Sequence, residues 1–190
     1  VFAGSNSAFG EVWWFYCSTA SNQVDKYVIW NYQENLWYTG SLDRSTWVDS
    51  GTYPLPYATK YDGTNSTLLI HESGKDDDGS TMTSFIESGD FDIGDGDDIL
   101  FINKLIPDFK GQVGNVNISL KSRYFPTDTQ TTKGPFRYST SSTKINTRTR
   151  GRQVAVRLES NGFNDINNDA TGEDWRLGTI RFEVQPDGKR

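Results

Sequence analysis

Few side chains in this sequence belong to the types that carry out nucleophilic or acid–base catalysis. The 190 residues contain one histidine, His71, and one cysteine, Cys17, and neither a Gly-x-Ser-x-Gly nucleophile turn nor a glycine-rich phosphate loop occurs. His71 follows an apolar run and is predicted to be a strand-edge side chain hydrogen-bonded to a neighbour. Cys17 closes an aromatic run and is predicted to be buried filler. We therefore expect a protein that is not an enzyme.

Two acidic clusters have the composition of a calcium loop, because Ca²⁺ takes several carboxylate and carbonyl oxygens from a short segment. The first comprises the five aspartates of residues 90–98, and the second spans residues 165–171. The second follows the oxygen spacing of an EF-hand loop, but Ala170 stands where the turn needs Gly and Arg176 where the last Glu belongs. Solvated turn residues that cap their own backbone are the favoured explanation of both clusters. We expect no cofactor, and a calcium-stabilised binding module stays open as a third interpretation. The oxygen-bearing residues of the two clusters are Asp90, Asp92, Asp95, Asp97 and Asp98, and Asp165, Asn167, Asp169 and Thr171.

The acids and tryptophans together are the ingredients of a glycosidase, which needs two carboxylates flanking a sugar and often aromatic platforms. Nothing in the spacing marks such a pair. The segment 41–47 resembles the Asp-box turn of sialidase-type propellers, although it is one residue short and lacks the Gly, and that turn is itself structural. Tryptophans in adjacent strands are predicted to serve core and inter-blade packing. They are Trp13, Trp14, Trp30, Trp37, Trp47 and Trp175.

An arginine stripe is formed by Arg148, Arg150 and Arg152, which fall two apart and project from one face of an extended strand. The stripe runs in phase with the apolar positions of residues 154–158. Either Gly151 hosts a bulge that changes the facing, or the strand passes from an interface into the core. Arginines also bind phosphates, but the net charge of −6 and the lack of a nucleic-acid reader module favour pairing with acidic loops of a neighbouring subunit.

Charge is divided unevenly along the chain. Residues 1–100 hold 4 basic and 16 acidic residues, a net charge of −12, whereas residues 101–190 hold 15 basic and 9 acidic residues, a net charge of +6. Complementary potentials fix register and partner choice between subunits. The division predicts a head-to-tail contact between copies, with two solvated surfaces of different composition as the open alternative.

The periodicity of the chain predicts an all-β fold. Aromatic and β-branched runs recur between Gly, Asn, Asp, Ser and Pro clusters, and none follows a 3.6-residue period. We expect propeller-like antiparallel blades in residues 1–82 and a β-sandwich-like domain in residues 83–190, with a boundary near the acidic segment 75–79. Alternation at Val116, Ile118 and Leu120 predicts half-buried strands with one wet face. The predicted strands are Glu11–Cys17, Lys26–Tyr32, Leu36–Gly40, Ser45–Val48, Tyr57–Tyr61, Thr67–His71, Thr83–Glu87, Asp98–Ile106, Val116–Tyr124, Phe136–Ser139, Gln153–Glu159 and Thr179–Val184.

No apolar run approaches the roughly 20 residues of a membrane-spanning helix. The first residues, Val1-Phe2-Ala3-Gly4, lack Met and the features of a signal peptide, so we expect a piece of a longer polypeptide. A lone cysteine excludes an internal disulfide and suits folding in a reducing cytoplasm.

Three stretches carry a resemblance to a known family. They are the aromatic hairpins of residues 11–16, 25–32 and 36–38; the segment Ile86–Gly94; and Arg150–Gln153 followed by Trp175–Gly178 and Pro186–Arg190. In their order and spacing they resemble the C-terminal portion of tail hub or nozzle proteins of short-tailed bacteriophages, the group that includes the packaged-DNA stabilisation proteins.

The resemblance implies a structural subunit of the virion tail, assembled in the host cytoplasm and without an active site. Such proteins form a ring, typically of six subunits, beneath the portal and adaptor and around the DNA exit channel. Implied partners are further copies, other tail proteins (adaptor, needle or fibre) and the passing genomic DNA, without sequence recognition. A glycan-binding or glycan-cleaving β-propeller of a host-recognition tail protein is the alternative. On this basis we expect Arg148, Arg150 and Arg152 at subunit contacts and Asp95, Asp97 and Asp98 facing the channel.

Overall fold

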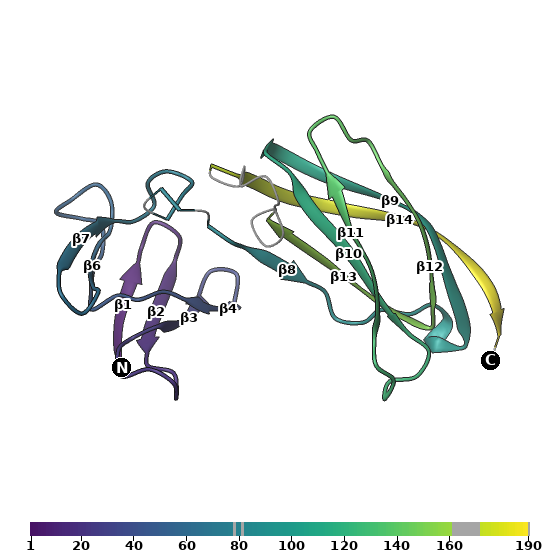
Figure 1. Ribbon diagram of the computed structural model, residues 1–190, viewed down its shortest axis with the longest axis horizontal. Coiled ribbons are helices and arrows are strands. Elements are labelled where there is room, and N and C mark those ends of the chain that lie inside the picture. Colours follow the sequence, from purple (N-terminus) through teal and green to yellow (C-terminus); the bar gives the residue numbers. More distant parts are fainter. Residues whose placement is uncertain (78, 81, 161–171, 190) are drawn as a thin grey trace. The chain divides into compact units, whose positions relative to one another are not determined.

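The computed structural model describes residues 1–77, 79–80, 82–160 and 172–189. The chain is all-β, as predicted, and its strands form four antiparallel sheets (Figure 1). It divides into two compact units, Val1–Ser73 and Gly74–Arg190, which are described separately below. In the described residues the one helical element is the 3-10 turn η1 at Gly94–Gly96.

The first sheet of the first unit is an antiparallel meander in the order β1-β2-β3-β4. The β3–β4 hairpin turns at Asn35, whose φ is 54°, and the Asn31 Oδ1 atom accepts hydrogen bonds from the backbone of Gln33 and Glu34 at 3.1 and 2.9 Å. These polar residues close the turn as predicted. The strands are β1 (Phe2–Asn6), β2 (Glu11–Tyr16), β3 (Lys26–Asn31) and β4 (Leu36–Ser41).

The second sheet of the first unit has the order β5-β6-β7, with β5 at Thr46–Val48, β6 at Tyr57–Tyr61 and β7 at Ser66–Ile70. The β6–β7 hairpin is closed by Asp62, whose carboxylate accepts hydrogen bonds from the backbone of Thr64 and Asn65 at 2.8 and 2.7 Å. An aspartate that bonds to the backbone two residues further on is a standard turn former.

The two sheets of the first unit share an aromatic core. Trp47 from β5 lies with its ring centroid 5.0 Å from that of Trp13 and 5.6 Å from that of Phe15, both on β2. The Trp47 Nε1–H donates to the carbonyl of Ser5 at 2.7 Å. Large rings bury much apolar area per residue, so a few aromatic residues form this core. Its buried members are Trp13, Phe15 and Ile29, with Phe2, Val24, Tyr27, Leu42 and Trp47 packed against them.

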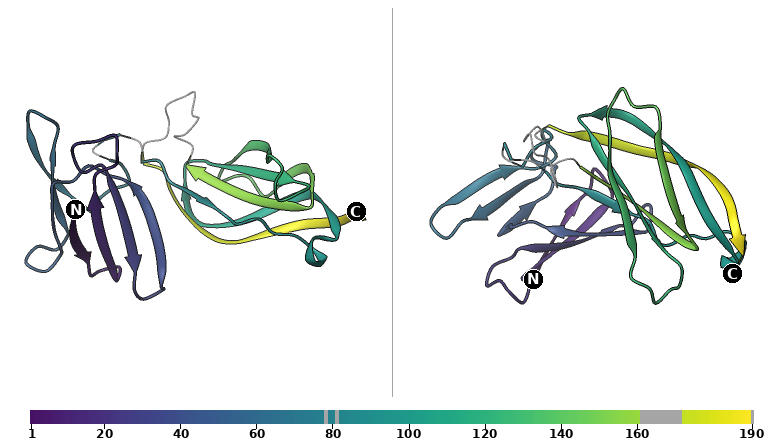
Figure 2. Two further views of the ribbon diagram at one scale, coloured as in Figure 1. Left: turned by 90° about the horizontal axis from the view of Figure 1, so that it is seen from below. Right: turned by 45° about the vertical axis from the view of Figure 1, so that its right-hand side comes forward.

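The second unit holds a four-stranded sheet in the order β11-β10-β13-β8 and a three-stranded sheet in the order β12-β9-β14. The antiparallel partners β9 and β14 are each 16 residues long and visibly curved (Figures 1 and 2). The strands are β8 (Phe85–Glu87), β9 (Asp98–Val113), β10 (Val116–Arg123), β11 (Thr131–Tyr138), β12 (Ile145–Gly151), β13 (Gln153–Ser160) and β14 (Asp174–Lys189).

Both sheets of the second unit contribute to one hydrophobic core. The predicted alternation of β10 is only half correct, because Asn117 and Ser119 are buried together with the apolar positions between residues 116 and 120. Their neighbours on the adjacent strand β13 are Glu159 and Arg157. Arg157 and Glu159 pair with each other at 2.8 Å over these small polar side chains, and Glu159 is itself buried, so this face is covered rather than wet. The core residues are Leu100, Ile102, Leu105, Val116, Ile118, Leu120, Tyr138, Ile145, Val154, Val156 and Leu158.

The chain passes from one sheet to the other at Arg152, between β12 and β13. In β12 the odd positions Ile145, Thr147 and Thr149 are buried, whereas in β13 the even positions 154, 156 and 158 are buried. This change of sheet explains why the exposed arginines of β12 and the buried apolar residues of β13 both occupy even positions, and no bulge at Gly151 is needed. A side chain there would crowd its neighbours, since a Cβ atom on residue 151 would lie 3.1 Å from the backbone oxygen of Arg123.

Candidate functional site

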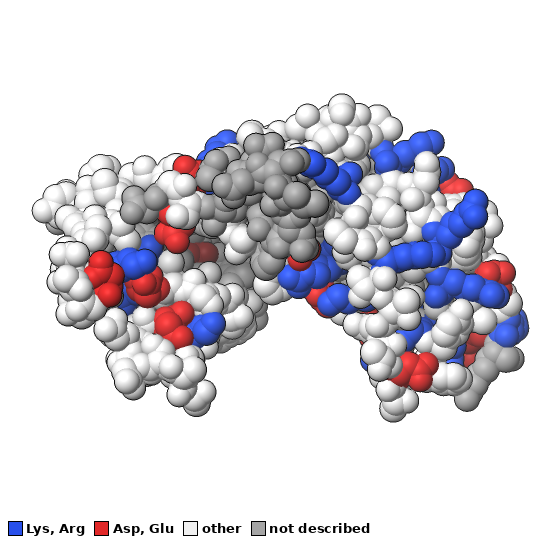
Figure 3. Space-filling model, in the orientation of Figure 1, with Lys and Arg blue, Asp and Glu red and all other residues white. Residues whose placement is uncertain are grey.

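A basic groove lies between the edge strands β11 and β12 of the second unit, with a volume of about 510 Å³. Several Lys and Arg side chains are visible over the region of β10, β11 and β12 (Figure 3). Edge strands carry charged side chains that discourage unwanted strand pairing, and the same charges attract acidic partners. The lining residues are Ser122, Arg123, Tyr124, Asp128, Thr129, Thr131, Lys133, Arg148, Thr149 and Arg150.

The predicted arginine stripe is divided by the structure. Arg148 and Arg150 are exposed on β12 and line the basic groove. Arg152 does not share their face, because β12 ends at Gly151; the Arg152 Nε–H donates to the carbonyl of Gly96 at 2.6 Å, and its guanidinium lies 5.8 Å from the centre of the Phe125 ring. Arg148 and Arg150 therefore line the groove together, and Arg152 instead stabilises the turn before β9.

The cations of the basic groove differ in their pairing. Arg150 contacts the carboxylate of Asp187 at 2.7 Å, and Arg123 pairs with Asp90. Lys133 donates to the backbone carbonyl of Arg148 and so bridges the two edge strands. Within the described part of the chain, no carboxylate lies within ion-pair distance of Arg148. Among the described residues, the groove thus retains the positive charge of Arg148 without a paired carboxylate.

The acids of residues 90–98 are not gathered around a common point. Asp90 is used internally, since its carboxylate pairs with Arg123 and accepts from the Gln130 amide at 3.0 Å. Asp95 and Asp97 are exposed on the η1 turn, and Asp98 is half-buried at the start of β9. Over the described residues, no three His, Cys, Asp or Glu side chains are placed to share a metal ion. The second predicted calcium loop, Asp165, Asn167, Asp169 and Thr171, lies outside the described residues.

The first unit presents an aromatic surface on the outer side of the β1–β4 sheet, here called the tryptophan face. Trp37 is 62% exposed, and its ring lies 5.9 Å from that of Trp14 and 6.0 Å from that of Trp30, in near-parallel pairs. Strand alternation places Val12 and Val28 on the same face. Trp13 is a core residue as predicted, but Trp37 is not. Three of the six tryptophans are therefore on an outer surface.

The outer side of the β5–β7 sheet is also apolar, and we call it the aliphatic face. Strand pairing directs Trp47, Ala58 and Leu69 to one side of this sheet. The opposite side carries the exposed residues Val48, Leu68 and Ile70, together with Tyr57.

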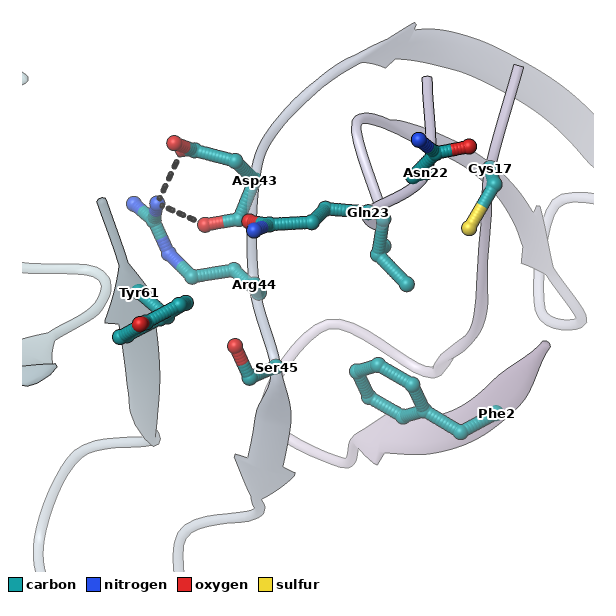
Figure 4. A pocket seen from close by; sticks show the side chains of 9 residues that line it. Phe2, Cys17, Asn22, Gln23, Asp43, Arg44, Ser45 and Tyr61 are labelled. Carbon is teal, nitrogen blue, oxygen red and sulfur yellow. Dashed lines mark hydrogen bonds and ion pairs between the residues drawn. The ribbon is translucent and has the colours of Figure 1, made fainter. Parts of the chain in front are cut away.

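A second cavity, of about 350 Å³, opens in the first unit (Figure 4). The buried Arg44 lines it, and its guanidinium donates from Nε to His71 Nε2 at 2.8 Å and from Nη1 to the Asp43 carbonyl at 2.9 Å. His71 therefore has the hydrogen-bonded neighbour that was predicted. Cys17, predicted to be buried, is instead exposed at this cavity, because β2 ends at Tyr16 and leaves the thiol in the following loop.

Burial and local hydrogen bonds are the main causes of the pKa shifts of two carboxylates in the first unit, Glu11 and Asp25. Burial raises the pKa of Glu11 above its ordinary value, partly offset by the hydrogen bond from Trp13. The hydroxyl and backbone of Ser18 donate to Asp25 at 2.7 Å and lower the pKa of that carboxyl. These two groups fix the ends of the β2–β3 hairpin, which is a structural task.

In comparisons with known proteins, no protein-family model matches the chain and no curated protein matches it. Throughout the described residues, the structure contains no helix with the length and apolar character needed to cross a bilayer.

Proposed function

We propose that this chain is a structural subunit of a phage tail, a ring-forming hub or nozzle component that encloses the DNA exit channel and carries no catalytic activity. The observation that supports this best is the pair of outer sheet faces in the first unit. Apolar surfaces of this kind mark contacts with other proteins, and an assembly subunit requires them.

The proposal assigns a specific architecture to each unit. The two sheets of the first unit are propeller-like blades, since a four-stranded meander packs its inner aromatic face on the next sheet through Trp47. The second unit is a β-sandwich, since strands of two sheets, β9 and β12 from one and β10 and β13 from the other, share one core. Propeller blades are arranged radially around a central channel.

The charged residues take two roles in the proposed ring. Arg148 and Arg150 bind acidic segments of the neighbouring subunit through the basic groove, and Arg152 supports the contact from the adjoining turn. Asp95, Asp97 and Asp98 face the channel, where negative charge repels the phosphates of the passing DNA and keeps it mobile. Neighbouring tail proteins, the adaptor and the needle or fibre, bind the ends of the ring.

The decisive experiment is the native mass of the purified chain, measured by native mass spectrometry and light scattering. We expect a closed ring, hexameric by the proposal. The double variant Arg148→Ala, Arg150→Ala is expected to shift the population toward monomer at raised salt, while circular dichroism still shows a folded β-sheet protein. A matched control is Arg181→Ala, which removes an exposed arginine outside the groove that pairs with Asp108 at 2.5 Å. A monomer at every concentration would contradict the proposal.

Glycan binding is the second candidate, favoured by the exposed ring of Trp37 and the half-buried rings of Trp14 and Trp30 beside it. Sugars stack on open aromatic faces, whereas these near-parallel rings lie partly against one another. A glycan array combined with a reducing-sugar assay separates the two candidates. Specific glycan capture that is lost in Trp37→Ala would favour the second.

A further inference from the structure

We propose that the first unit contains a binding site for a hard divalent cation, Ca²⁺ foremost, formed by side-chain oxygens of Asn6, Glu11 and Glu72. The site lies on the inner face of the β1–β4 sheet, in a part of the molecule to which the proposed function assigns no role. It is separate from the two acidic clusters of the sequence, and it combines two carboxylates with one amide oxygen. Carboxylate and amide oxygens are the ligands that Ca²⁺ takes in proteins.

The amide oxygen of Asn6 is buried without a partner. Asn6 is fully buried at the end of β1, and its Oδ1 atom has no hydrogen-bond partner among the described residues. The Asn6 Nδ2 atom donates to Glu72 Oε1 at 2.9 Å, and a flipped amide would instead set two oxygens against each other. A buried polar atom is costly to leave unpaired, and a bound cation supplies the partner that Oδ1 lacks.

Two carboxylates converge on this amide. The pairing of β1 with β2 places Asn6 directly opposite Glu11, so the two side chains project from the same face of the sheet. Glu72, two residues beyond the end of β7, reaches the same place through its hydrogen bond to Asn6. Burial raises the pKa of Glu11, and the nearby negative charge of Glu72 adds to the increase. Side chains from three separate segments therefore meet at one corner of the first unit.

Each of the three side chains retains an oxygen atom for a metal ion. Glu11 Oε2 accepts a hydrogen bond from Trp13 Nε1 at 2.9 Å, and Glu72 Oε1 accepts the one from Asn6. The other oxygen of each carboxylate forms no hydrogen bond within the part of the chain that the structure describes. Over the same part of the chain, neither glutamate has an ion pair with a lysine, arginine or histidine. The two negative charges therefore attract a cation from solution.

The exposure of the three residues gives the ion a way in. Asn6 is buried, Glu11 is half-buried and Glu72 is exposed, so a hydrated ion can approach on the Glu72 side and keep water molecules as its further ligands. Affinity for Ca²⁺ depends on the number and charge of the ligands, and this site offers fewer than an EF-hand loop. We expect a dissociation constant of about 0.1–1 mM, as in other weak calcium sites.

Terbium luminescence tests the site in the whole chain, because Tb³⁺ replaces Ca²⁺ and emits light when a nearby tryptophan is excited. Trp13 is hydrogen-bonded to Glu11, and its ring centroid lies 5.0 Å from that of Trp47, so a sensitising ring lies beside the ion. We expect Tb³⁺ emission on tryptophan excitation that an excess of Ca²⁺ displaces. We also expect Ca²⁺ to raise the melting temperature relative to the chain in a chelator, because the ion binds the folded state.

Glu72→Gln is the principal variant. It removes one charge from an exposed residue, and the glutamine oxygen can still accept the hydrogen bond from Asn6, so the fold is preserved. We expect the Tb³⁺ titration to shift to about tenfold higher concentration or more, because the charge of the ligands sets the affinity. Glu11→Gln should have the same effect while leaving an acceptor for Trp13. The matched control is Glu34→Gln, which removes an exposed carboxylate in the β3–β4 turn.

The outcomes separate this site from the acids of the second unit and from the proposed function. Weakened emission in both Gln variants, with Glu34→Gln and Asp95→Asn unchanged, supports the site. Full emission in Glu11→Gln and Glu72→Gln places the ion elsewhere and overturns the inference. A wild-type chain with neither emission nor a Ca²⁺-dependent melting temperature overturns it as well, and leaves a buried water molecule as the partner of Asn6 Oδ1. The proposed function is tested independently, by the native mass.

Discussion

Trp47 lies against Gly4 so closely that a Cβ atom on residue 4 would come within 2.3 Å of the Trp47 Cδ1 atom. The contact joins the two sheets of the first unit, and the indole N–H of Trp47 completes it by donating to the adjacent Ser5 carbonyl. The absence of a side chain at residue 4 therefore sets the distance between the β1–β4 sheet and the β5–β7 sheet.

Gly4→Ala is expected to destabilise the first unit by about 1–3 kcal/mol, because the methyl group overpacks the indole. Denaturant unfolding followed by tryptophan fluorescence measures the change. Gly89→Ala is the control, since a Cβ atom there meets nothing within 4 Å. An unchanged midpoint in Gly4→Ala would show that Trp47 moves aside without cost.

Gly151→Ala is expected to destabilise the second unit by about 1–3 kcal/mol for a different reason. Its new methyl group would lie 3.0 Å from the Ser122 Cβ and 3.1 Å from the Arg123 carbonyl oxygen, and backbone yields less readily than a side chain. The loss should appear in the hydrogen exchange of β12 and β13 while β1–β7 keeps its protection. Equal loss in both units would contradict this local origin.

Arg44→Ala is expected to lower the free energy of unfolding of the first unit by about 2–4 kcal/mol, since it removes a buried guanidinium that is only 4% exposed and bonds both His71 and Asp43. Thermal melting gives the change. The control is Lys60→Ala, whose ammonium lies 3.1 Å from the same Asp43 carboxylate but is 40% exposed. An effect of Lys60→Ala as large as that of Arg44→Ala would mean that charge, not burial, sets the cost.

Glu87→Gln is expected to reduce stability by about 0.5–1 kcal/mol at pH 7, as for other partly exposed pairs. Hydrogen bonds from Lys121 and then from Arg157 hold the pKa of Glu87 below its ordinary value of 4.5. The carboxylate therefore stabilises the fold fully above pH 4.5, and this contribution is lost as the pH falls through the lowered pKa. Melting temperatures from pH 7 to 3 should show wild type and variant converging in acid.

The control for the pH experiment is Glu34→Gln, an exposed glutamate in the β3–β4 turn. Its curve should follow that of the wild type at every pH. A gap between Glu87→Gln and wild type that widens in acid would reverse the assigned sign.

Sequence patterns predicted the hairpins well where turn chemistry is local. Asn31 and Asp62 close their turns with their own side chains, so the strands beside them follow from nearby residues. Strand β1 was missed because Ala3, Gly4 and Ser5 carry no strand signal, and its pairing with β2 supplies the stability instead. Tertiary context commonly overrides such weak propensities.

The long strands β9 and β14 exceeded their predicted lengths, Asp98–Ile106 and Thr179–Val184. Pro107 directly follows the predicted end of the first, and proline cannot donate to a sheet ladder. In the structure it pairs with Ile180 beside a register shift between Leu177 and Ile180, and such an irregularity tolerates the missing donor. Irregularities of this kind depend on the partner strand and leave no trace in either segment alone.

The basic groove was only partly predictable. The spacing of Arg148 and Arg150 identified one wall, but Lys133 and Arg123 come from the other sheet, which periodicity within β12 does not reveal. The exposure of Trp37 was missed for a related reason, since its run Leu36-Trp37-Tyr38 reads as core and only the pairing of β4 at the sheet edge places it outside.

The pairing of Asp98 with Lys189 at one end of the β9–β14 ladder sets an order of events on the ribosome. Every strand of the first unit finds its partner within the first 70 residues, so that unit can mature while the rest is still being translated. The β12-β9-β14 sheet cannot be completed until β14 has been synthesised. Until then, β9 exposes an unpaired apolar edge. Nascent chains released before β14 should therefore be the form that requires chaperone protection.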